Sequence, residues 1–106
     1  MNQITATELK ARMDAGEDVQ LIDVRQPNEY EYARIPTAKL IPMSEIFSRL
    51  AELDPSREAV IQCHTGGRSA RVIDALERSG YEGNLTNLAG GIAAWSADVD
   101  PSVPTY

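Results

Sequence analysis

The sequence predicts an α/β fold in which a mostly parallel β-sheet is covered by helices on both faces. Short segments rich in Val, Leu and Ile alternate with segments that have helical periodicity and helix-capping signals. Strands that alternate with helices at this spacing form parallel sheets. Val19–Val24 is almost continuously apolar, which is typical of a strand buried on both faces. The 106 residues, 1–106, are enough for one domain with a modest core.

The first expected element is a helix near the N-terminus. Thr5 and Glu8 have the spacing of a capping box, in which each satisfies a free backbone amide at the helix start. Leu9 and Met13 lie on one apolar face of this helix, and Gly16 ends it.

Two short helices are expected between the strand Val19–Val24 and the middle of the chain. Pro27 opens the first, because proline is favoured in the first helical turn. A turn at 33–36 and a short strand at Lys39–Ile41 follow. Ser44 is a plausible N-cap of the second helix, whose apolar residues are Ile46, Phe47 and Leu50.

The C-terminal half repeats the strand–helix pattern twice. Ala59–Ile61 is the apolar run of a buried strand, and Ser69–Ser79 is a helix with Gly80 as its stop. Asn84–Leu88 is the last strand that we expect, followed by Gly90-Gly91 and a helix with Ile92 and Trp95 in the core. We expect 98–106, which contains two prolines, to be an extended tail of the same domain.

The loop after Ala59–Ile61 carries the strongest chemical signal in the chain. It contains Cys63, the only cysteine, together with two adjacent glycines and Arg68. A loop between a strand and a helix N-terminus directs backbone amides and the positive end of the helix dipole at such a thiol. These surroundings lower a thiol pKa, so we expect a nucleophilic thiolate. Arg68 could bind an anionic group attached to the sulfur through its planar guanidinium.

The carboxyl end of Val19–Val24 should lie beside this loop, because ligands of parallel sheets bind at the carboxyl ends of the strands. Asp23 and Arg25 stand at that end and could help to shape the rim of the site. The more economical interpretation is that Arg25 pairs with a carboxylate such as Glu29 as part of the local structure. We expect Arg34 and Arg71 at the same end of the sheet.

Composition excludes several classes of function. The net charge of −6 disfavours nucleic-acid binding, which requires a basic surface. We see no apolar run of membrane-spanning length and no signal-peptide pattern, so we expect no membrane partner. One cysteine and one histidine make a metal site unlikely to form, and we expect no metal and no cofactor. A single cysteine also fits a reducing compartment, and we expect the cytoplasm.

Three sequence patterns together resemble the rhodanese family of sulfurtransferases in its single-domain form. The first is Leu21-Ile22-Asp23-Val24-Arg25 with Glu29-Tyr30 and Ala33-Arg34-Ile35-Pro36. The second is Cys63-His64-Thr65-Gly66-Gly67-Arg68-Ser69, and the third is Asn87-Leu88-Ala89-Gly90-Gly91-Ile92 with Trp95. The resemblance implies a single rhodanese-like domain with a five-stranded, mostly parallel sheet. The chain departs from the family at Arg34 and Thr37, where the family often has histidine and glycine, and we expect changes at the rim.

The resemblance implies that Cys63 carries a sulfane sulfur as a persulfide. The donor would be thiosulfate, a polysulfide or a protein persulfide, and the acceptor cyanide, a small thiol or a protein thiol, which includes a protein sulfur carrier. The loop amides from His64, Thr65, Gly66, Gly67, Arg68 and Ser69 would stabilise the terminal sulfur. We expect the His64 side chain to point to solvent. Thiosulfate-specialised members carry further basic residues where this chain has His64 and Thr65, which makes efficient use of thiosulfate doubtful.

Two alternatives stay open at this point. One is a rhodanese-like docking module without chemistry, against which the retained cysteine and glycine loop argue. The other is a cysteine-dependent phosphatase or arsenate reductase. Those enzymes have one more residue between cysteine and arginine than the four between Cys63 and Arg68, so this loop suits one sulfur atom better than a phosphoryl group.

Overall fold

A computed structural model describes all 106 residues and contains one five-stranded sheet in the order β1-β5-β4-β2-β3, in which every neighbouring pair is parallel. The strands are β1 (Asn2–Ile4), β2 (Val19–Asp23), β3 (Lys39–Leu40), β4 (Glu58–Gln62) and β5 (Leu85–Leu88). The helices are α1 (Ala6–Asp14), α2 (Pro27–Tyr32), α3 (Gly67–Arg78) and α4 (Gly91–Asp98), with 3-10 turns η1 (Met43–Glu45) and η2 (Leu50–Glu52). The α/β prediction is confirmed.

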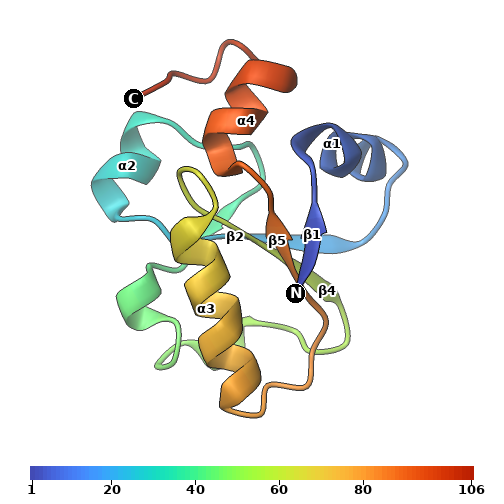
Figure 1. Ribbon diagram of the computed structural model, residues 1–106, viewed down its shortest axis with the longest axis vertical. Coiled ribbons are helices and arrows are strands. Elements are labelled where there is room, and N and C mark those ends of the chain that lie inside the picture. The colour runs from blue at the N-terminus through green and yellow to red at the C-terminus, as the bar shows by residue number, and fades with distance from the viewer.

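The sheet separates two apolar layers of the core. Successive residues of a strand point to opposite faces, so Leu21 and Val60 enter the layer under α1 and α4, whereas Ile22 and Ile61 enter the layer under α3. Figure 1 shows α1 and α4 together on one side of the sheet and α3 on the other. This two-sided burial explains why consecutive residues in the middle of the central strands, Leu21-Ile22 and Val60-Ile61, are apolar.

The local signals at two helix starts are confirmed. Thr5 caps α1, its side chain accepts a hydrogen bond from the Glu8 amide, and the Glu8 carboxylate accepts one from the Thr5 amide. Pro27 occupies the first turn of α2, as expected. None of the helices is both long and apolar enough to cross a bilayer.

The first strand was missed in the sequence. β1 pairs along β5, with Asn2 opposite Thr86 and Ile4 opposite Leu88. Only Ile4 of its three residues is buried, so β1 has no hydrophobic pattern of its own. Its position is set by pairing with the edge of β5 that faces away from β4, and the four residues of β5 are all buried.

The prediction of a helix capped by Ser44 is wrong. Ser44 lies inside the 3-10 turn η1, and a second 3-10 turn, η2, follows. Of the three apolar residues assigned to the helix, Ile46 is buried and Leu50 is half-buried, but Phe47 is 49 % exposed. A continuous helix needs a broader buried face to be held against the core, and this segment does not supply one.

Thr37 has an unusual backbone conformation in the turn before β3. Its φ of +75° lies in the left-handed region, and it is the one residue other than glycine that has a positive φ. A β-branched side chain is strained there. The departure from glycine noted in the sequence therefore falls at a position whose geometry favours glycine.

Candidate active site

Cys63 lies directly after β4, at the carboxyl end of the sheet, in a loop that turns sharply into α3. Gly66 makes the turn with φ +111°, a conformation open to glycine, and α3 begins at Gly67, two residues earlier than predicted. The Gly66 amide donates a hydrogen bond to Cys63 Sγ over 3.1 Å. The thiol therefore sits inside the curve of its own loop, at the N-terminus of a helix.

Opposing effects act on the Cys63 thiol. Burial raises its pKa, because an apolar environment disfavours the thiolate. Hydrogen bonds from the Ser69 hydroxyl and from the amides of Ser69, Gly66 and Thr65 lower the pKa, and the net pKa lies below the ordinary value of a thiol. The local geometry thus favours the thiolate, which is the nucleophilic form of the sulfur.

Ser69 and Asn87 form a polar support below the sulfur. Ser69 Oγ lies 3.3 Å from Cys63 Sγ and also donates to Asn87 Oδ1 at 2.5 Å. The Asn87 amide nitrogen donates to the Gly66 carbonyl oxygen over 3.2 Å. Sequence reasoning did not assign Asn87 to the site, although a polar pair, Thr86-Asn87, inside an expected strand was the available signal.

The N-terminus of α4 holds the backbone of the cysteine loop. The Ile92 amide donates to the Cys63 carbonyl over 2.9 Å, and the Ala93 amide donates to the His64 carbonyl over 3.0 Å. Gly91 permits this approach: a Cβ there would lie 2.4 Å from the Cys63 carbonyl oxygen and 2.5 Å from that of His64, and its φ is +58°. The Gly90-Gly91 pair is therefore part of the loop's support.

Arg68 is paired with a carboxylate. Its two terminal nitrogens donate to the Glu29 carboxylate over 2.7 and 2.9 Å. The hydrogen bonds from Arg68 are the main reason that the pKa of Glu29 is lowered to about 2. The guanidinium fork that we expected to receive an anion is thus occupied by Glu29, and its charge is balanced.

The expectation that Arg25 pairs with a carboxylate as part of the local structure is confirmed, but the partner is not Glu29. Arg25 pairs instead with Asp23: Arg25 Nη2 lies 2.7 Å from Asp23 Oδ2, and both side chains have no exposed surface. Arg25 also donates to the Ala33 carbonyl and, at 3.4 Å, to the Glu29 carbonyl. Arg25 thus holds carbonyl oxygens within α2 and at its C-cap from inside the protein, so Asp23 and Arg25 support the rim without lying open on it.

The two remaining arginines at this end of the sheet have no carboxylate partner. The Arg34 guanidinium lies over the Tyr30 ring, 4.9 Å from its centroid. Arg71 is exposed on α3 and lines a shallow apolar groove with Met43 and Phe47. Neither arginine makes a hydrogen bond to the cysteine loop.

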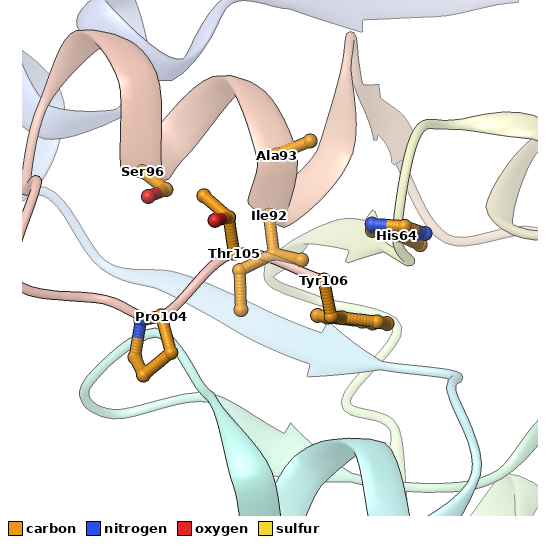
Figure 2. A pocket seen from close by; sticks show the side chains of 7 residues that line it. All are labelled: His64, Ile92, Ala93, Ser96, Pro104, Thr105 and Tyr106. Carbon is orange, nitrogen blue, oxygen red and sulfur yellow. The ribbon is translucent and has the colours of Figure 1, made fainter.

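His64 does not point freely to solvent, which corrects the expectation for its side chain. The imidazole is half-buried and stacks on the Tyr106 ring, with 4.0 Å between centroids and 9° between planes. Figure 2 shows the two rings lying parallel beside a pocket between α4 and the last residues of the chain. Residues 99–106 thus reach the site, which sequence reasoning about an extended tail did not foresee.

The thiol itself is covered. Cys63 is 1 % exposed, and none of the cavities of the molecule has Cys63 in its wall. Thr65 and Gly67 are the exposed residues of the loop, and Gly66 and Arg68 are half-buried. No three side chains of His, Cys, Asp or Glu come together as metal ligands. The arrangement supplies an activated sulfur in a closed, water-poor site.

Comparison with known proteins identifies relatives over almost the whole chain. The family model of the rhodanese-like domain matches residues 5–98. A sulfurtransferase of Allochromatium vinosum is 40 % identical over 91 % of this chain and 89 % of its own length. The crystal structure of a rhodanese-like domain protein from Staphylococcus aureus has a TM-score of 0.84 and 36 % identity, and the match covers 100 % of this chain and 99 % of that one.

Some relatives are larger proteins. A rhodanese-like/PpiC domain-containing protein of Arabidopsis thaliana is 36 % identical over 100 % of this chain, and the chain spans 38 % of that protein's length. The similarity covers the domain described here and not the remaining part of the plant protein.

Proposed function

The chain belongs to the rhodanese-like domain family, and on that premise we propose that Cys63 carries a sulfane sulfur as a persulfide between a donor and a thiol acceptor. One observation supports the proposal above the others: the Gly66 amide lies 3.1 Å from Cys63 Sγ, inside a loop whose amides and Ser69 hydroxyl lower the pKa of the thiol. A group that stabilises a thiolate also stabilises the anionic end of a persulfide.

The chemistry has two half-reactions. In the first, the Cys63 thiolate attacks the outer sulfur of the donor, the S–S bond of the donor breaks, and its electron pair leaves with a thiolate or with sulfite. Cys63 then holds an S–S⁻ group. In the second, an acceptor thiolate attacks the outer sulfur of this group, a new persulfide forms on the acceptor, and the Cys63 thiolate is released.

We propose that persulfides of small neutral thiols are better donors than thiosulfate. Thiosulfate carries two negative charges, and the protein has a net charge of −6. Arg68 in the loop is already paired with Glu29, and the buried Arg25 is paired with Asp23. The two unpaired arginines at this end of the sheet, Arg34 and Arg71, make no hydrogen bond to the cysteine loop, so the repulsion of a dianion is not offset inside the loop. A persulfide brings one charge or none.

The burial of the thiol favours a second candidate, a rhodanese-like docking module that performs no sulfur transfer. A sulfur that is 1 % exposed is poorly placed for a bimolecular reaction unless the site opens. The next experiment separates the two candidates, because only the carrier needs Cys63 to be loaded with sulfur.

Mass spectrometry of the intact protein after treatment with the persulfide of a small neutral thiol, with polysulfide or with thiosulfate tests the proposal. We expect an adduct of one sulfur atom on Cys63, which a small thiol removes, and loading by the small persulfide at least tenfold faster than by thiosulfate. Cys63→Ser serves as the control that locates the adduct. Absence of the adduct with every donor would exclude the sulfur carrier and leave the docking module, whereas equal loading by thiosulfate would contradict only the donor preference.

A further inference from the structure

Residues 99–106 form a short segment that follows α4 and lies outside the region matched by the family model, which ends at residue 98. Its middle is anchored: Val103 is buried in the core layer under α4, and its carbonyl accepts a hydrogen bond from Ser96 Oγ over 2.7 Å. We call residues 99–106 the C-terminal strap. Figure 1 shows that it runs from α4 toward α2.

The end of the C-terminal strap is held by the side chain of Tyr106. The Tyr106 hydroxyl donates to Glu29 Oε2 and accepts from Arg25 Nη1, each over 2.8 Å. The ring stacks on His64, and the Tyr32 ring meets it edge-on with 6.0 Å between centroids. Tyr106 therefore joins the residue after the catalytic cysteine to the carboxylate that pairs with Arg68.

The last residues of the strap pack loosely against α4. A pocket lies between them, lined by Ile92, Ala93 and Ser96 on one side and by Pro104 and Thr105 on the other (Figure 2). The contacts of Tyr106, with a hydrogen bond of 3.5 Å from the Tyr32 hydroxyl to the Thr105 carbonyl, hold this end in place instead of a continuous apolar interface. Tyr106 is 47 % exposed, so release of its ring requires no opening of the core.

We propose that Tyr106 is a specificity-determining residue, which holds the C-terminal strap over the cysteine loop and restricts access to Cys63 to narrow molecules. Cys63 is 1 % exposed, so a reactant reaches the sulfur only when a neighbouring segment moves. The loop is fixed by α4 and by Ser69 with Asn87, whereas the strap meets the loop only through the partly exposed ring of Tyr106 on His64. A small displacement of the strap admits narrow sulfur compounds, whereas a bulky or protein-borne thiol needs the Tyr106 end of the strap fully released.

The inference rests on the proposed function, because it concerns access of donors and acceptors to the same sulfur. Alkylation tests it without any sulfur transfer, since a thiolate is the only requirement. The rates of modification of Cys63 by iodoacetamide, which is narrow, and by fluorescein maleimide, which is bulky, are measured across pH. The limiting rate at high pH reports access to the sulfur separately from the thiol pKa.

We expect Tyr106→Ala to raise the limiting rate with the maleimide at least tenfold and the rate with iodoacetamide by less than threefold. Tyr106→Phe keeps the stacked ring and loses both hydrogen bonds, so its rates should lie between those of wild type and Tyr106→Ala. Tyr81→Phe is the matched control: it removes a buried tyrosine hydroxyl that has no hydrogen-bond partner, beyond the far end of α3 from Cys63. Its rates should equal those of the wild type.

An unchanged ratio of the two rates in Tyr106→Ala would overturn the proposal. Circular dichroism and urea denaturation establish that each variant is folded under the assay conditions. If Tyr106→Ala does not fold, the rates of Tyr106→Phe are the test. Rates of Tyr106→Phe equal to those of the wild type with both reagents would then overturn the proposal. Because alkylation does not use a sulfur donor, failure of the strap and failure of persulfide formation give separate results.

Discussion

Replacing Ser69 with alanine tests whether a side-chain hydroxyl stabilises the thiolate of Cys63. Ser69 Oγ lies 3.3 Å from the sulfur, but its single proton has two other acceptors, Asn87 Oδ1 at 2.5 Å and the Gly66 carbonyl oxygen at 3.2 Å. In the neutral state the thiol can donate to Ser69 Oγ while the hydroxyl donates to Asn87. Ionisation removes the thiol proton, so the hydroxyl must turn toward the sulfur to stabilise the charge.

The size of the effect follows from this competition. A hydrogen bond to a charged group stabilises it by about 1.5–3 kcal/mol, which corresponds to roughly 1–2 units of pKa at 1.36 kcal/mol per unit. The hydroxyl gives up its hydrogen bond to Asn87 when it turns toward the sulfur, so we take the lower end of this range for the change in pKa. Ser69→Ala should therefore raise the pKa of Cys63 by about 1 unit, while the amides of Gly66 and Thr65 continue to lower it.

The pH dependence of iodoacetamide alkylation measures this pKa, and the thiolate absorbance near 240 nm gives an independent value. Ser79→Ala is the matched control, because Ser79 follows the same helix, about 15 Å away along its axis, and bonds only the Leu76 carbonyl. A pKa in Ser69→Ala that is unchanged or lower than that of the wild type would refute the reasoning. It would mean that the hydroxyl proton stays on Asn87 and that the backbone amides alone activate the thiol.

Three further predictions concern stability, measured by urea denaturation. Gly91→Ala should destabilise the protein by about 2–4 kcal/mol, because its Cβ would lie 2.4 Å from a loop carbonyl oxygen. Gly16→Ala is the control: φ there is +77° but nothing lies within 4 Å, so the loss of stability should be only about 1 kcal/mol. Equal losses of stability in the two variants would contradict the steric explanation. Thr37→Gly should stabilise the protein by about 0.5–1 kcal/mol, since φ at Thr37 is +75°; a loss of stability would show that Thr37 is not strained. Glu29→Gln should destabilise the protein by about 1–2 kcal/mol at pH 7 after allowance for partial exposure to solvent. Because the pKa of Glu29 is lowered to about 2 by Arg68, the contribution of Glu29 is complete above about pH 4.5 and is lost as the pH falls through about 2. The difference between Glu29→Gln and wild type should shrink over that range, and a difference that does not depend on pH would exclude the ion pair as its source.

The central part of the fold could be predicted because its signals are local. β2 and β4 each contain a short apolar run, β5 begins and ends with leucine, α3 has a clear apolar face, and the capping box of α1 lies within four residues. β1 could not be predicted in this way, because two of its three residues are exposed and its position depends on the edge of β5. The helix expected after Ser44 failed for a related reason: local capping and apolar spacing were present, but the exposed Phe47 left too narrow a buried face.

In the site, the residue types were predictable and their partners were not. The position of Cys63 at a strand end and before a helix followed from the pattern of the chain. The partner of Arg68 is Glu29, 39 positions earlier, and the partner of Arg25 is Asp23 instead of the nearby Glu29. Charged side chains choose among several partners by geometry that only the folded chain defines, and the same is true of the contact between His64 and Tyr106.

The two hydrogen bonds from α4 to the cysteine loop also determine how the amides near the thiol are oriented. A peptide unit is planar, with its carbonyl and the next amide pointing in opposite directions. When Ala93 holds the carbonyl of His64, it also sets the direction of the Thr65 amide, which is one of the groups that lower the pKa of the thiol. The loop is thus oriented before any reactant arrives, by a helix that contributes no atom to the chemistry. A graft of residues 62–69 into another scaffold would carry over every reactive group and still lose their alignment, unless the scaffold offered two amides in the place of Ile92 and Ala93.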